Sequence, residues 1–149
     1  FTMYHSITTG EIIMLKSRRD ALGITELDSL EELVDLGLTC GAQEGTTQQQ
    51  ELSTEAPGAL QTYADYLLAV EDMKRGAIDS VYAETPITTE WIALAEPGKE
   101  LVVIFRRPYY PVAFVAHKDA DTLVEKINSV LTEMIGNGDL DALKKKWRC

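Results

Sequence analysis

The chain has 149 residues, which is enough for one domain with a sizeable core. Its 14 basic and 24 acidic residues give a net charge of −10. This balance argues against nucleic acid as a partner, because proteins that bind a phosphate backbone present a basic surface. No apolar run approaches the about 20 residues that span a bilayer. The sequence opens at Phe1 without a signal-peptide pattern, so we interpret it as a mature product or an excised piece.

Predicted strands and helices alternate along the chain. A strand at 11–15 is followed by residues 16–26, which we expect to be an exposed connection. A short helix at 28–37 has a capping box of Ser29 and Glu32 and a stop at Gly37. The remaining predicted elements are a strand at 38–42, a helix from about Thr47 to before Pro57, a helix at 62–76, a strand at 80–83, a short helix at 85–98, strands at 101–105 and 111–117, a helix at 121–135 and a last helix that holds Trp147.

This alternation predicts the fold class. Strands that alternate with short helices indicate an α/β fold, with a mostly parallel sheet and helices on both faces. Ligands of such sheets bind outside the carboxyl ends of the strands. Two loops are expected there, Gln43–Thr47 after the strand "LTCGA" and Glu84–Thr85 after the strand "SVYA".

The loop "EGTT" (44–47) has the composition of an anion site. The first N–H groups of a helix lack intrahelical acceptors and carry partial positive charge, so a carboxylate or phosphate binds there. Gly45 permits close approach of the backbone, and Thr46 and Thr47 add hydroxyl donors. The alternative is a plain helix cap in which Thr46 serves only its own helix. The loop lacks the GK[ST] ending of a nucleotide-binding P-loop.

Glu84 directly follows a predicted buried strand at the edge where ligands bind. Its carboxylate suits an ammonium group, and the alternative is a solvated side chain or one that favours the N-terminus of the next helix. An anion site and an acid together suit a zwitterion such as an α-amino acid. Tyr82 and Tyr110 are candidates for the lining of a cleft.

Catalytic and metal chemistry have no clear pattern in the sequence. We identify no Gly-x-Ser-x-Gly elbow and no serine with plausible histidine and aspartate partners. Cys40 and Cys149 form neither a CxxC motif nor a cluster with zinc spacing. We therefore expect no enzyme activity, no metal and no cofactor.

The ordered features resemble the family 3 extracytoplasmic solute-binding proteins of amino-acid transport, which have the type II periplasmic-binding fold. "ITELDSLEELVDLGLTCGAQEGTTQQQEL" is similar to the family's segment of short helix, strand and GTT ligand loop. "MKRGAIDSVYAETP" is similar to its stretch with an acid before Thr-Pro, and the residues from "YYPVAFVAHKD" to the final "KKKW" resemble its C-terminal region. "FTMYHSITTGEIIMLKS" resembles the strand that crosses from the first lobe to the second.

The resemblance implies a division of the chain. Residues 1–15 would be the crossing strand and 16–110 the second lobe with half of the ligand site. Residues 111–149 would be the return strand and the C-terminal helices, which normally pack on the first lobe. Most of that first lobe would be absent from this chain. The apolar surface left by the missing first lobe would then be covered by dimerisation or by segment exchange.

The resemblance also implies a function. A two-lobe cleft would bind a small polar amino acid without catalysis, outside the cytoplasm, and deliver it to an ABC-type membrane permease or a receptor domain. Gly45, Thr46 and Thr47 would contact the ligand carboxylate and Glu84 its ammonium group, with Gln43 and Thr85 beside them. Family members more often have Asp at position 84, whereas Glu is usual in ionotropic glutamate receptor cores. The alternatives are therefore the ligand-binding core of a glutamate-receptor-like channel or sensor, and a dehydratase-like enzyme on the same fold.

Overall fold

The computed structural model describes residues 1–147, apart from the side chains of residues 108–110. The chain forms two compact units, which we describe separately. One consists of Gly10–Arg107, and the other combines Phe1–Thr9 with the chain from Pro108 onward. Among the described residues, none of the helices combines the length and the apolar character needed to cross a membrane.

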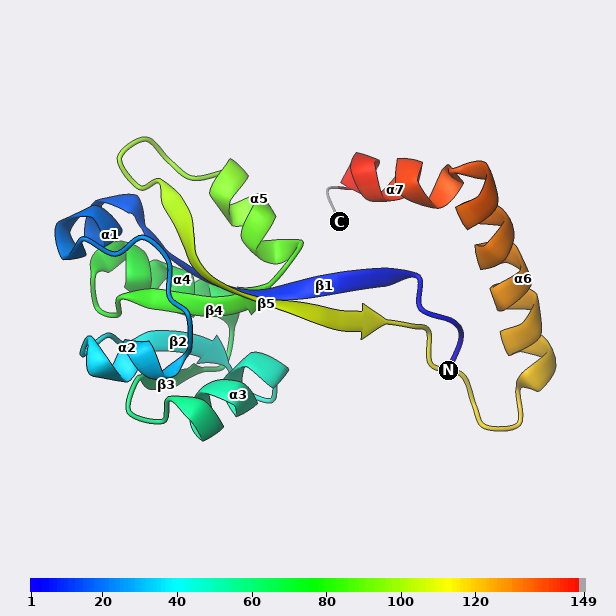
Figure 1. The fold of residues 1–149 in the computed structure, drawn as a ribbon, viewed down its shortest axis with the longest axis horizontal. Coiled ribbons are helices and arrows are strands. Elements are labelled where there is room, and N and C mark those ends of the chain that lie inside the picture. Colours follow the sequence, from blue (N-terminus) through cyan, green and yellow to red (C-terminus); the bar gives the residue numbers. More distant parts are fainter. Residues whose placement is uncertain (148–149) are drawn as a thin grey trace. The chain divides into compact units, whose positions relative to one another are not determined.

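A five-stranded sheet is the centre of the unit Gly10–Arg107, and its strand order is β3-β2-β4-β1-β5 (Figure 1). β2 pairs in parallel with both β3 and β4, whereas β1 pairs antiparallel with β4. The sheet is therefore mixed, and the α/β class is confirmed. The strands are β1 (Ser6–Leu15), β2 (Cys40–Gln43), β3 (Leu60–Tyr63), β4 (Ser80–Glu84) and β5 (Leu101–Val112).

Helices cover both faces of this sheet. The strands alternate their side chains between the two faces, as a period of two requires. Ile12 and Tyr82 pack with the helices α2 and α3, whereas Ile13 and Val81 pack with α4 and α5. The helices of this unit are α1 (Lys16–Leu22), α2 (Glu31–Asp35), α3 (Thr47–Glu55), α4 (Tyr66–Arg75) and α5 (Ile87–Ala93).

The second unit contains the two C-terminal helices, α6 (Asp121–Asn137) and α7 (Asp139–Trp147). Gly138 separates them in the left-handed conformation, with φ of 83°. Leu131 is buried, whereas Val130 and Ile135, on the same predicted apolar stripe, are about half exposed. The amphipathic pattern thus predicted both helices, but much of the apolar stripe of α6 has no cover within this unit.

Several predicted elements differ from the structure in type or extent. Residues 16–26 were predicted to be a connection, but they contain the helix α1. This helix buries no residue, so its sequence has no apolar pattern that would predict it. The helix predicted from residue 62 begins only at Tyr66, because Asp65 caps it and the preceding residues form strand β3. The strand predicted at 111–117 ends at Val112, as the last part of the long strand β5.

Candidate functional site

The loop after β2 has the conformation of a tight turn into a capped helix. Gly45 has φ of 76°, a left-handed value that side chains disfavour. Thr46 is extended and is the N-cap of α3. Its hydroxyl accepts a hydrogen bond from the N–H of Gln49 at 3.2 Å and donates one to the carbonyl of Gln43 at 2.7 Å. The Thr46 hydroxyl therefore serves the helix itself, whereas the side chain of Thr47 is exposed at the first helical position.

Contacts with β3 hold this turn in place. The N–H of Glu44 donates to the carbonyl of Tyr63 at 2.8 Å, and the Gln43 side-chain amide donates to the carbonyl of Ala64 at 3.2 Å. Gln43 thus fixes the loop to the neighbouring strand, a role that depends on a strand missed in the sequence.

Glu84 is the last residue of β4 and is half-buried. Because β2 and β4 are parallel, with Gly41 opposite Val81, the loops that follow them lie at the same edge of the sheet. Thr85 comes next and is joined to Pro86 by a cis peptide bond, after which α5 begins. The two loops predicted from the sequence are therefore neighbours.

Tyr66 contacts Gln48 in α3, the helix that follows the first loop, and its sequence position did not indicate a site residue. Its ring is buried against Trp91, with centroids 5.9 Å apart in an edge-to-face arrangement. Burial raises the pKa of its phenol, a hydrogen bond with the Thr46 side chain lowers it, and the negative charge of Glu84 raises it. The position of Tyr66 in a predicted helix indicated only packing. The capping residue Asp65 was the one local sequence feature that places Tyr66 at the first turn of α4.

Gln48 is a further polar side chain at this edge. It is 2% exposed, and its Oε1 accepts a hydrogen bond from the Tyr66 hydroxyl at 3.4 Å. Its Nε2 atom has no hydrogen-bond partner among the described residues. An unpaired donor of this kind is unusual inside a protein.

Of the two tyrosines predicted as cleft lining, Tyr82 is the one whose side chain the structure describes. Tyr82 has 0% exposure in the core, and its hydroxyl donates to Glu51 at 2.6 Å. Its burial does not fit a place in the cleft, because side chains alternate along β4 and that of Tyr82 points into the sheet–helix interface. The side chain of Tyr110 lies outside the described residues.

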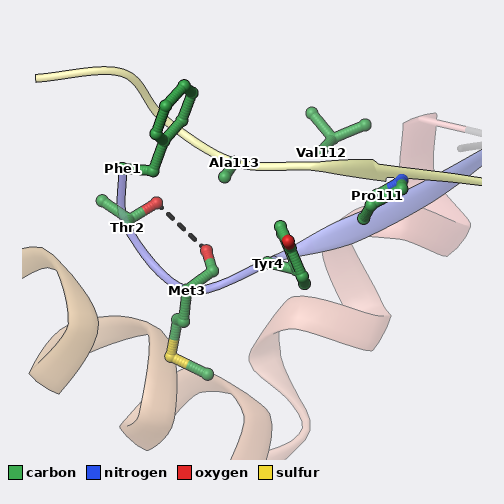
Figure 2. Close-up of a pocket in the computed structure, with 7 residues that line it drawn as sticks. All are labelled: Phe1, Thr2, Met3, Tyr4, Pro111, Val112 and Ala113. Atoms are coloured by element: carbon green, nitrogen blue, oxygen red, sulfur yellow. Dashed lines mark hydrogen bonds between the residues drawn. The ribbon is translucent and has the colours of Figure 1, made fainter.

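A separate hollow lies in the unit that combines Phe1–Thr9 with the chain from Pro108 onward. It has a volume of about 770 Å³ and is lined by Phe1–Tyr4 and Pro111–Ala113 (Figure 2). The Thr2 hydroxyl donates to the Met3 carbonyl at 3.0 Å along its wall. This lining offers no charged side chain, so the hollow lacks the paired charges of the loops at the sheet edge. Among the described residues, no group of three or more His, Cys, Asp or Glu side chains is arranged to hold a metal.

Comparison with known proteins gives consistent relatives, although no family model matches the chain. The ABC transporter arginine-binding protein 1 of Escherichia coli is 27% identical over 135 residues, which are 85% of this chain and 54% of that protein. The arginine-binding periplasmic protein of Mannheimia haemolytica is 29% identical over 114 residues, 73% of this chain and 48% of that protein. The chain therefore spans about half the length of these relatives.

Solved structures agree on the fold. An ancestral arginine-binding protein bound to arginine superposes with a TM-score of 0.79 at 24% identity, over 99% of this chain and 63% of that one. The mixed sheet with helices on both faces and the order of its elements match the resemblance found in the sequence. The chain therefore has the fold of these amino-acid-binding proteins, and its sequence is similar to those of arginine-binding proteins of ABC transport.

Proposed function

We propose that the chain provides half of a binding site for a free amino acid, which it binds without changing it chemically. The ligand carboxylate would lie at the first turn of α3, and the ammonium group would pair with Glu84. The observation that carries this proposal is the convergence of the two loops, since parallel β2 and β4 end at the same edge of the sheet, with Gly41 opposite Val81. Opposite charges at one edge of the sheet complement a zwitterion.

The contacts within the anion half-site can be assigned more closely than the sequence allowed. Because the Thr46 hydroxyl caps α3, we assign Thr46 to support and Thr47 to direct contact, through its hydroxyl and N–H. Gly45 would let the ligand approach the backbone, and Thr85 would border the ammonium side. These roles are the contacts that the family resemblance implies, assigned to the residues of this turn.

The relatives guide the choice of ligand and context. Two of them are named for arginine, and their names also place them in the periplasm or with ABC transporters. Arginine is thus the first ligand to test, before the smaller polar amino acids that we expected from the sequence. We propose that the protein works outside the cytoplasm and delivers its ligand to an ABC-type permease. The carrier names favour this function over a receptor core or a dehydratase-like enzyme.

The lobe boundaries and the dimer stay predictions. We propose that the unit Gly10–Arg107 is the second lobe, close to the expected range 16–110. The exposed apolar side chains of α6 would then be covered by a first lobe or by a second copy of the chain.

The test is calorimetric titration of the twenty amino acids into the natural-length protein, with the variant Glu84→Gln. We expect micromolar binding of arginine or a few polar amino acids. Loss of one hydrogen bond to a charged group is worth about 1.5–3 kcal/mol, so Glu84→Gln should weaken binding by about 10- to 100-fold.

Glu96→Gln is the matched control, because Glu96 is exposed and lies outside both loops. It should bind like the unmodified protein. Absence of binding across all twenty amino acids, or equal affinities for Glu84→Gln and Glu96→Gln, would contradict the proposed site.

A further inference from the structure

Two successive arginines, Arg106 and Arg107, lie on β5 at the end of the unit Gly10–Arg107. Side chains of neighbouring residues in a strand point to opposite faces of the sheet. Each arginine forms an ion pair with a different part of the unit, Arg106 with Glu11 and Arg107 with Glu55. These pairs lead to the two helices that follow the proposed ligand loops.

Arg107 is bound to the C-terminal end of α3. Its two terminal nitrogens reach the two carboxylate oxygens of Glu55 at 2.7 and 2.6 Å, which is a bidentate pair. Its Nη1 is also 3.5 Å from Glu51 Oε1. Arg107 holds the pKa of the Glu55 carboxyl below its ordinary value, as expected of a pair that favours the charged form.

α3 depends on such polar contacts more than the other long helix of this unit. Its buried residues are Gln48 and Leu52, so one apolar side chain fixes it to the sheet. α4, by comparison, buries Tyr66, Ala69, Val70 and Met73. The Tyr82 hydroxyl adds a bond from β4 to Glu51 of α3 at 2.6 Å. The position of the first turn of α3 thus depends on Leu52 and on the contacts of Glu51 and Glu55.

Arg106 acts on α5 through Glu11. The Glu11 side chain of β1 is 8% exposed, and its Oε1 is 3.0 Å from Arg106 Nε. Its other oxygen, Oε2, accepts a hydrogen bond at 2.5 Å from the hydroxyl of Thr88, a fully buried residue in α5. A buried carboxylate requires a compensating charge, and Arg106 supplies one to Glu11, which holds α5 to β1 through Thr88.

We propose that Arg106 and Arg107 are positioning residues, each of which fixes one half of the ligand site. Arg107 fixes α3, whose first turn receives the carboxylate, and Arg106 fixes α5, which follows Glu84 and Thr85. This inference rests on the proposed function for the identity of the two halves. The anchoring of the two helices, however, can be tested without a ligand.

The first experiment measures amide hydrogen exchange in Arg106→Met and Arg107→Met, variants that keep most of the apolar stem and remove the charge. In Arg107→Met, the N–H groups of Gln50 and Ala56, bonded to Thr46 and Leu52, should exchange at least about tenfold faster, and those of α5 should not. In Arg106→Met, the N–H groups of Glu90 and Leu94 should respond instead. Each variant is thus the control for the other, and uniform acceleration in both would overturn the anchoring.

The second experiment compares affinities for arginine, its α-amide and its des-amino analogue in the natural-length protein. Arg107→Met should lose at least about tenfold in the preference for arginine over the α-amide, because the carboxylate half is displaced. Arg106→Met should lose the preference over the des-amino analogue instead. An equal loss for all three compounds in both variants would mean that the arginines only stabilise the fold.

Lysine variants separate positioning from charge alone. Arg107→Lys should stay impaired, because lysine cannot form the bidentate pair with Glu55, whereas Arg106→Lys should recover most of the preference through one contact. Full recovery in Arg107→Lys would contradict the bidentate role. If the unmodified protein binds no amino acid but the exchange effects are helix-specific, the proposed function fails and the anchoring stands.

Discussion

At the scale of single residues, Cys40 is the group whose chemistry the fold changes most. It has 0% exposure at the start of β2, and burial raises the pKa of its thiol from 9.0 to about 12. In the unfolded chain, the thiol ionises near its ordinary pKa. The contribution of this thiol to the free energy of unfolding should therefore be constant below pH 9. It should fall as the pH rises from 9 toward 12, because the unfolded chain then loses the proton that the folded chain retains.

The same burial predicts that Cys40 is unreactive in the native protein. Labelling with a thiol reagent at pH 8 should require unfolding, and an unfolding free energy of at least about 5 kcal/mol would slow it by ~1,000-fold or more relative to a free thiol. The background is Cys149→Ser, which leaves Cys40 as the only thiol in the sequence. Rapid labelling of this variant without denaturant would show that β2 is open to solvent, and Cys40→Ser is the unlabelled control.

Gly41, the next residue, shows how closely β2 approaches the helix behind it. A Cβ at this position would lie 2.8 Å from Ile78 Cδ1 and 3.1 Å from Ala69 Cβ. Gly41 thus has its value in packing, because a side chain there would collide with α4 and with Ile78. Gly45 is the true turn residue of the loop, because its φ is left-handed while a Cβ there would meet no atom within 4 Å.

At the scale of elements, the cap of α3 links local stability to the site. Removal of an N-cap hydroxyl typically costs about 0.5–2 kcal/mol. Thr46→Ala should lower the free energy of unfolding by about 1 kcal/mol and also weaken ligand binding, because the turn loses its bond to the Gln43 carbonyl. Thr46→Ser, which keeps the hydroxyl, should restore both in urea unfolding and calorimetry. A Thr46→Ala variant with unchanged stability and affinity would contradict the role of the cap.

Elements whose chemistry is local were predictable. The turn and helix at Gly45–Thr47 follow from a glycine and a capping threonine, and both are found in the structure. α1 was missed because it buries no residue, and β3 because its side chains are half-buried or exposed, so neither shows an apolar period. β3 is a strand because β2 pairs with it, which no local pattern reports.

The residues of the candidate site likewise divide into those that a local motif predicts and those that only the assembled fold brings together. Gly45, Thr46, Thr47 and Glu84 carry chemistry that a short motif displays. Tyr66 reaches the site because β3 and α4 place it there, and its sequence position indicates only a helix face. The ion pairs of Arg106 and Arg107 join residues 95 and 52 positions apart, so they appear only when the sheet is assembled.

At the scale of the whole molecule, the core is concentrated in one unit. Every buried residue of the two hydrophobic clusters lies between Ile12 and Phe105. In the described part of the other unit, Leu131 is the one buried apolar side chain. Burial of apolar surface is the main favourable term in folding, so the unit Gly10–Arg107 holds most of the stabilising contacts.

We therefore expect a fragment of residues 10–107 to fold by itself. It should unfold in one cooperative transition on heating, with a midpoint within about 10 °C of the full chain, because 1 kcal/mol shifts the midpoint of such a domain by about 4–8 °C. Circular dichroism in the far and near ultraviolet would report secondary structure and packing together. Leu33→Ala is the matched control, since Leu33 has 0% exposure and such a truncation costs about 2–5 kcal/mol. It should lower the midpoint equally in the fragment and in the full chain, whereas a fragment without a cooperative transition would show that β1 and β5 need their outer halves to complete the sheet.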